Sequence, residues 1–186
     1  MKKVLIVLII LTQALLYHAC NNQDKNKAEK STILVNQSDV DEEAKSFMKA
    51  ASISGIMEVE LAKLAQKQAS SSAVKEYADM MIADHTRIYN DLKKLATDKH
   101  ILLPIDLEPK EREQLERLQK LNGAEFDENY MRFMVTSHEK AVSDFEMGGR
   151  NRDRDVNKFA SAKIEELKTH LNSARSLFNT VVIKGQ

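Results

Sequence analysis

The chain has 186 residues with 28 Lys+Arg and 28 Asp+Glu, so its formal net charge at pH 7 is zero. Hydrophobic residues make up 42% of it, which excludes wholesale disorder, and five Gly and two Pro exclude collagen-like repeats. The balanced charge argues against nucleic-acid binding, which would require a basic excess. A single Cys excludes an internal disulfide and a zinc site built from several Cys.

The N-terminus has the pattern of an export signal. Lys2 and Lys3 precede an apolar run, residues 4–16, that is shorter than the roughly 20 residues of a membrane span. The next four residues, Tyr17-His18-Ala19-Cys20, resemble the end of a bacterial lipoprotein signal, although Tyr17 stands where such signals usually carry Leu. The resemblance implies that residues 1–19 are removed and that lipidated Cys20 anchors the protein to a membrane, facing the periplasm or the cell surface. The alternative is an ordinary secretory signal.

Residues 20–40 are polar and of mixed charge, apart from an Ile33-Leu34-Val35 triplet. This composition predicts a flexible tether between the anchor and a folded domain. The remaining residues, 41–186, are enough for one domain.

Four long helices and one short helix are predicted in this domain. They cover residues 41–69, 73–98, 109–121, 124–147 and about 153–182. A serine turn supplies an N-cap after the first helix, and Pro109 suits the first turn of the short one. Gly148-Gly149 ends the fourth segment.

Apolar residues at spacings of three and four mark one face of the long helices. The clearest lines are Val74, Ala78, Met81, Ile88, Leu92 and Leu95, and Ala160, Ile164, Leu167, Leu171, Ala174, Phe178 and Val181. Such stripes predict an all-α four-helix bundle with an extra short helix between the second and third long helices. The connection 99–123 could form a crossover, which gives ferritin-like topology, or an excursion in an up-down-up-down bundle.

Acidic and imidazole side chains interrupt these apolar faces. Glu58, His85 and His138 point inward from three helices, and counting at 1.5 Å per residue places them at about one height. A carboxylate and two imidazoles suit Zn, Fe, Mn or Cu, so these residues are predicted metal ligands. Asp84, beside His85, lies on the flank, where it could orient a neighbouring side chain.

A second inward cluster is predicted about two turns away along the bundle axis. It pairs Asp127 with His170, with Tyr130 beside them, so that the carboxylate orients the imidazole. His100 lies in a connection and is expected at the surface.

The same residues also have a structural interpretation. A buried Glu–His–His network can fix the register of a bundle through hydrogen bonds alone, without a cofactor. The di-iron signature needs Glu-x-x-His on two helices, but Ile82, Val135 and Leu167 stand at the required Glu positions, which argues against a ferroxidase site. A single transition metal is the cofactor that the metal interpretation requires.

The stretch from Phe47 to Leu95 resembles the bacterial domain-of-unknown-function family 4142. The residues that carry the resemblance are Ala50-Ala51, Gly55, Met57-Glu58-Val59-Glu60-Leu61, Leu64-Ala65, Val74-Lys75, Met81 and Asp84-His85. The later residues that agree are Leu103-Pro104, Phe126-Asp127-x-x-Tyr130, His138 and His170-Leu171, so the resemblance covers roughly residues 43–180. It implies a ferritin-like bundle exported to the envelope, often described as an outer-membrane protein, and it implies no activity.

No motif for a reaction is present, since the sequence has neither a phosphate-binding Gly-rich loop nor a Gly-x-Ser-x-Gly elbow. We therefore expect an envelope lipoprotein of unassigned function whose domain is a non-enzymatic binding or structural module. The alternative is a metal-binding or redox-active protein that uses Glu58, His85 and His138. The membrane, through Cys20, is the one partner that the sequence indicates, and no protein partner is identified.

Overall fold

The computed structural model describes residues 23–184, with their side chains described from 42 to 183. The predicted signal peptide, residues 1–19, and the predicted lipidation site, Cys20, lie outside the described residues. Contacts within the chain define two units, residues 1–41 and 42–186, and the bundle belongs to the second.

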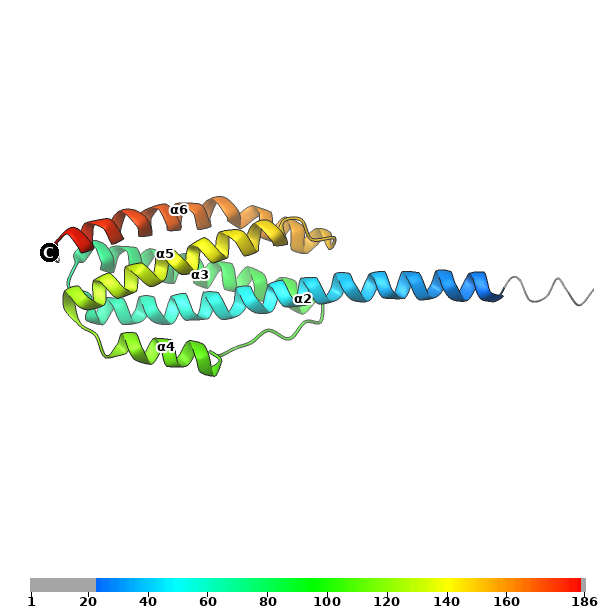
Figure 1. The fold of residues 1–186 in the computed structure, drawn as a ribbon, viewed down its shortest axis with the longest axis horizontal. Coiled ribbons are helices and arrows are strands. Elements are labelled where there is room, and N and C mark those ends of the chain that lie inside the picture. Colours follow the sequence, from blue (N-terminus) through cyan, green and yellow to red (C-terminus); the bar gives the residue numbers. More distant parts are fainter. Residues whose placement is uncertain (1–22, 185–186) are drawn as a thin grey trace, which may run out of the picture. The chain divides into compact units, whose positions relative to one another are not determined.

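The described residues contain five helices (Figure 1). They are α2 (Gln23–Gln68), α3 (Ser72–Asp98), α4 (Pro109–Gln119), α5 (Gly123–Gly148) and α6 (Arg154–Lys184). The predicted all-α bundle with a short extra helix is confirmed. Within the described part of the chain, no helix combines the length and the apolar composition of a membrane span.

Helix α2 begins earlier than the sequence analysis predicts. A flexible tether is predicted over residues 20–40, whereas the structure is helical from Gln23. No Gly or Pro, the two residues most unfavourable in a helix interior, occurs between Gln23 and Gly55. Polar composition alone therefore does not distinguish a helix from a tether.

Helix α3 ends in a Schellman motif around His100. His100 has a positive φ of 56°, its N–H donates to Thr97 O at 3.1 Å, and the Ile101 N–H donates to Ala96 O at 2.8 Å. Ile101 then packs against the apolar cluster that contains Ala96. The motif leaves the His100 side chain exposed, as predicted.

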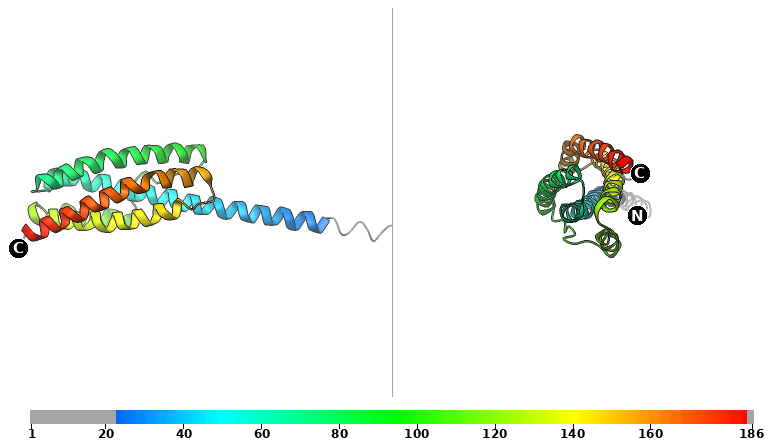
Figure 2. Two further views of the ribbon diagram at one scale, coloured as in Figure 1. Left: turned by 90° about the horizontal axis from the view of Figure 1, so that it is seen from above. Right: turned by 90° about the vertical axis from the view of Figure 1, so that its left-hand side faces the viewer.

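Helices α3 and α5 begin at the same end of the bundle. Asp127, near the start of α5, accepts hydrogen bonds from the N–H groups of Ser70 at 3.1 Å and Ser71 at 2.9 Å, just before α3. The two helices are therefore parallel, and the connection 99–122 must return along the bundle, carrying α4 with it (Figure 1, Figure 2). Of the two predicted paths for the connection, the structure therefore has the crossover, which gives ferritin-like topology.

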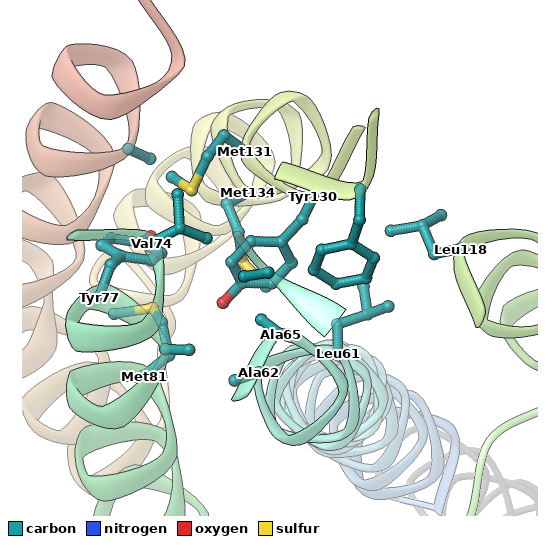
Figure 3. Close-up of a cluster of buried hydrophobic side chains, with 14 of the residues drawn as sticks. Leu61, Ala62, Ala65, Val74, Tyr77, Met81, Leu118, Tyr130, Met131 and Met134 are labelled. Carbon is teal, nitrogen blue, oxygen red and sulfur yellow. The ribbon is translucent and has the colours of Figure 1, made fainter. Parts of the chain in front are cut away.

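The largest apolar cluster draws side chains from α2, α3, α4, α5 and α6. Figure 3 shows Leu61 of α2, Tyr77 of α3, Tyr130 of α5 and Leu118 of α4 within it. The rings of Tyr77 and Tyr130 meet edge to face, with their centroids 6.4 Å apart. Since Leu118 belongs to this cluster, the crossover helix covers part of the core.

A second apolar cluster follows along the same helices and includes Ile88 of α3, Ala141 of α5 and Leu167 of α6. Met81 and Met134 belong to the first cluster, and each lies about two turns before its counterpart in the second, Ile88 on α3 and Ala141 on α5. Between these two clusters, Glu58, His85, His138 and His170 are buried but polar, and they form one layer.

Candidate metal centre

Each long helix contributes one buried polar side chain to a single layer. They belong to Glu58 of α2, His85 of α3, His138 of α5 and His170 of α6, and the exposed fractions of these whole residues are 1%, 3%, 0% and 1%. The three histidines continue the apolar stripes of their helices at spacings of three or four, which is why they face inward.

The three imidazole rings form a nearly equilateral triangle. The ring centroids lie 5.4 Å apart for His85 and His138, 5.3 Å for His85 and His170, and 5.5 Å for His138 and His170. Each ring offers a nitrogen within 4.8 Å of those of the other two. Three imidazoles at such distances are a recurrent protein site for a transition metal.

One nitrogen of each ring is held by an oxygen that can only accept a hydrogen bond. His85 Nδ1 lies 3.0 Å from Glu58 Oε2, His138 Nδ1 lies 2.9 Å from Met134 O, and His170 Nε2 lies 3.0 Å from Asp84 Oδ2. Because an ionised carboxylate or a carbonyl has no hydrogen to give, each of these nitrogens must carry the proton. The partners therefore fix the tautomer of every neutral ring.

The opposite nitrogen of each ring has no partner. His85 Nε2, His138 Nε2 and His170 Nδ1 are buried and make no hydrogen bond to any described residue. In the neutral tautomers these nitrogens carry lone pairs, so all three are acceptors. When all three rings are neutral, a water molecule, which has only two hydrogens, could satisfy two of these lone pairs, whereas a metal ion could accept all three.

Burial and charge decide how the layer is protonated. Burial and the nearby charge of His85 lower the pKa of His170 to about 4, and burial also lowers the pKa of His138. Both rings are therefore neutral at neutral pH and have a lone pair available. Burial would lower the pKa of His85 as well, but the facing Glu58 carboxylate outweighs it and raises that pKa.

Glu58 is a buried anion. Burial opposes its ionisation, but the charges of His85 and His138 and the hydrogen bonds from His85 and the Ser137 hydroxyl lower the pKa of Glu58 to about 2. A buried charge needs compensation, which a protonated His85 or a bound cation could supply. A cation bound to the neutral rings would therefore take over the charge compensation that a protonated His85 otherwise supplies.

The structure brings Glu58, His85 and His138 together, as predicted, but it changes their roles. Glu58 contacts the protonated nitrogen of His85, so it is placed to orient that ring rather than to face the three free nitrogens. His138 Nδ1 is 3.7 Å from Glu58 Oε1, which is too long for a hydrogen bond. His170, and not Glu58, is the third member of the triangle with His85 and His138.

The predicted pair of Asp127 and His170 does not form. Asp127 instead accepts bonds at the α2–α3 turn, including one from the Ser70 hydroxyl at 2.6 Å. The prediction counted heights along the helix axes, but side chains lean toward the N-terminus of their own helix. In the antiparallel pair α5 and α6, this lean brings His138 and His170 closer together and moves Asp127 and His170 further apart.

Tyr130 also has a different place from the predicted one beside that pair. Its ring stacks on Phe126 with 5.6 Å between the centroids, and its hydroxyl is buried without a hydrogen-bond partner among the described residues. Tyr130 is therefore part of the apolar core.

Two supporting residues of the site carry little sequence signal. Asp84 holds His170 from α3, and Ser137 donates to Glu58 from α5. Each immediately precedes a site histidine in the chain, and the flank position of Asp84 was visible in the sequence. Their partners could not be derived, because both contacts cross between helices that are far apart in sequence.

Comparisons with known proteins agree with this fold. The family model "Domain of unknown function (DUF4142)" matches residues 30–177. No curated protein matches the sequence. Among solved structures, the chain is similar to a DUF305 fragment from Deinococcus radiodurans, with a TM-score of 0.66, 11% identity, and coverage of 74% of this chain and 96% of that one. At this identity the likeness shows the fold alone.

Proposed function

This chain belongs to the DUF4142 family, which is described only as a domain of unknown function, and we propose that it binds one transition-metal ion through His85, His138 and His170. The observation that carries the proposal is the set of three buried ring nitrogens without hydrogen-bond partners. Leaving such groups unsatisfied in a protein interior is costly, and a shared cation satisfies all of them.

The surrounding contacts support the same proposal. Histidines that bind metals commonly donate their other N–H to a carboxylate or a backbone carbonyl, and all three rings have such a partner in Glu58, Met134 O and Asp84. Three imidazoles suit Zn²⁺, Cu²⁺, Ni²⁺ or Co²⁺ and leave one coordination position of a tetrahedral ion for another ligand.

We further propose that the metal-binding domain is exported and membrane-anchored. The support is the sequence of residues 1–20, with two lysines, a short apolar run and Cys20. Incorporation of labelled lipid that is lost in Cys20→Ser, while export continues, tests this part of the proposal separately. If the wild-type chain is exported without a lipid, the protein is an ordinary secreted protein and the lipoprotein proposal is wrong.

Metal analysis of protein purified without a His-tag tests the binding site. After loading with Co²⁺ or Zn²⁺ and dialysis, we expect one ion per chain, and we expect His138→Ala and His170→Ala to lose it. The control is His100→Asn, which removes an exposed histidine and keeps a residue that tolerates positive φ. Far-UV circular dichroism checks that each variant is folded.

The visible spectrum of bound Co²⁺ adds a readout of the ligands themselves. If no ion is retained, or if His138→Ala and His170→Ala both retain it as the wild type does, the metal proposal fails. A protein that binds no metal but loses much of its stability on His138→Ala would instead support the structural interpretation of the layer.

A further inference from the structure

A group of charged side chains lies on the solvent side of His170. Asp84 of α3 and Glu166 of α6 each place a carboxylate oxygen within 4.8 Å of the other and of a nitrogen of His170. Their side chains are 28% and 22% exposed, whereas the His170 side chain is 2% exposed. These two carboxylates therefore lie between solvent and the buried triad of His85, His138 and His170.

A guanidinium bridges the two carboxylates. Arg87 Nη2 donates to Asp84 Oδ1 at 3.1 Å and to Glu166 Oε1, and the Arg87 side chain is 50% exposed. Arg87 is thus a cation of the protein itself, held where two carboxylates and an imidazole could otherwise receive a metal ion.

His170 belongs to both groups. Its Nε2 contacts Asp84 on the outer side, and its buried Nδ1 is one of the three nitrogens without a partner. An ion held by the outer carboxylates is therefore separated from the triad by a single imidazole ring.

The other polar approach to the layer is less suited to a cation. A groove of about 680 Å³ between α2, α4 and α5 reaches Ser137, whose hydroxyl contacts Glu58. Its lining contains Lys110, Arg132 and Lys140 against two acidic residues, which disfavours an approaching cation. The small cavity that touches Glu58 and His85 is otherwise lined mainly by apolar side chains.

We propose that metal ions reach the triad past Asp84 and Glu166, and that Arg87 closes this passage until an arriving ion displaces its guanidinium. The proposal rests on the metal-binding function proposed above. It concerns the rate of uptake, whereas the ion's final ligands are the three histidines.

Glu166 is the residue to test, because it contacts Arg87 and makes no hydrogen bond to a triad histidine. In stopped-flow mixing with Co²⁺ at neutral pH and low salt, we expect Glu166→Gln to slow uptake by roughly 3- to 10-fold and Arg87→Gln to accelerate it by a similar factor. Both effects should shrink at high salt, because the side chains are partly exposed.

Helix α6 supplies a control for each substitution. Glu165→Gln removes the same charge from a side chain that is 89% exposed, and Arg175→Gln removes a half-exposed arginine that pairs with Glu139. We expect both variants to take up Co²⁺ at the wild-type rate. Equilibrium titration of Glu166→Gln should still give one ion per chain.

Three outcomes would overturn the passage. If Glu166→Gln and Glu165→Gln behave alike while the wild type binds Co²⁺, the passage is wrong and the metal site stands. If Ser137→Ala alone changes the uptake rate, ions pass through the groove instead. If the wild type binds no Co²⁺ at equilibrium, the metal site and the passage are both wrong.

Discussion

Glu58 Oε2 lies 3.0 Å from His85 Nδ1, and the two side chains are 1% and 4% exposed. This contact joins α2 to α3 and fixes the direction of the His85 ring. It also places a negative charge beside a histidine that we propose as a metal ligand. Both effects should strengthen the binding of a cation without making the carboxylate a ligand.

Glu58→Gln therefore should weaken Co²⁺ or Zn²⁺ binding by roughly 10- to 100-fold and leave the stoichiometry at saturation unchanged. The amide oxygen can still accept from His85 Nδ1, but the charge is gone. Isothermal titration measures both quantities. Glu60→Gln, a half-exposed carboxylate that pairs with Lys63, is the control.

Complete loss of the ion in Glu58→Gln would restore the carboxylate to the ligand set that the sequence analysis predicts. Wild-type affinity in the same variant would mean that the pair neither orients His85 nor assists the cation.

Asp127 stabilises the turn between α2 and α3. Its carboxylate accepts hydrogen bonds from the N–H groups of Ser70 and Ser71 and from the Ser70 hydroxyl, and the residue is only 2% exposed. We expect Asp127→Ala to lower the free energy of unfolding by about 2–3 kcal/mol, because three partly buried hydrogen bonds to a carboxylate are lost. Urea denaturation measures this loss.

The metal content of Asp127→Ala should equal that of the wild type, since Asp127 has no contact with His170. Glu128→Ala, which removes a surface pair with Arg132, should change stability by less than about 0.5 kcal/mol. Loss of metal in Asp127→Ala without unfolding would contradict the separation of the two residues.

Local sequence signals predict most of the helices, but they predict the candidate site only in part. Pro109 and Gly148 mark helix boundaries that the structure keeps to within one residue. Inward direction could be predicted for His85 and His138 because helical period fixes it. The crossover could not, since it depends on a contact between Asp127 and residues more than 50 positions away.

His170 shows why counting along an axis is insufficient. Its height relative to His138 depends on the connection between α5 and α6 and on the opposite lean of the two side chains, neither of which is periodic. The contact with Asp84 of α3 adds a third helix. Such contacts depend on how the helices pack against one another, and the periodicity of a single helix does not predict that packing.

Asp153 ties the start of α6 to the end of α3. Its carboxylate accepts from the N–H of Asp155 at 3.0 Å, the N–H of Val156 at 3.2 Å and the Lys99 ammonium at 2.7 Å. Partial burial opposes ionisation, but the Lys99 and backbone hydrogen bonds outweigh it and lower the pKa of Asp153. The ionised form therefore stabilises the folded state.

Because the folded pKa lies below the unfolded one, this stabilisation is present above the unfolded pKa of about 3.9 and is lost as the pH falls through the folded pKa. Asp153→Asn should lower the free energy of unfolding by about 1 kcal/mol at neutral pH, and its difference from the wild type should shrink in acid. Urea denaturation across a pH series measures the difference. A difference that stays constant into acid would show that the charge of Asp153 contributes nothing.

Gly148 ends α5 in a space that has no room for a side chain. A Cβ there would lie 2.7 Å from Cε2 of Phe47 and 3.0 Å from the Cβ of Ala160, and the methyl of Ala160 is fully buried. We expect Gly148→Ala to lower the free energy of unfolding by roughly 1–3 kcal/mol, because the Phe47 ring must move out of its packing. Denaturant unfolding followed by circular dichroism measures this change.

Gly55 provides the matched comparison, because a Cβ at this position in the interior of α2 meets nothing within 4 Å. Glycine inside a helix costs roughly 0.5–1 kcal/mol relative to alanine, so Gly55→Ala should raise the free energy of unfolding by about that amount. The two substitutions add the same methyl group to two helices and should have opposite signs. If Gly148→Ala also stabilises the protein, the close approach of α5 to Phe47 and Ala160 is not a constraint on this fold.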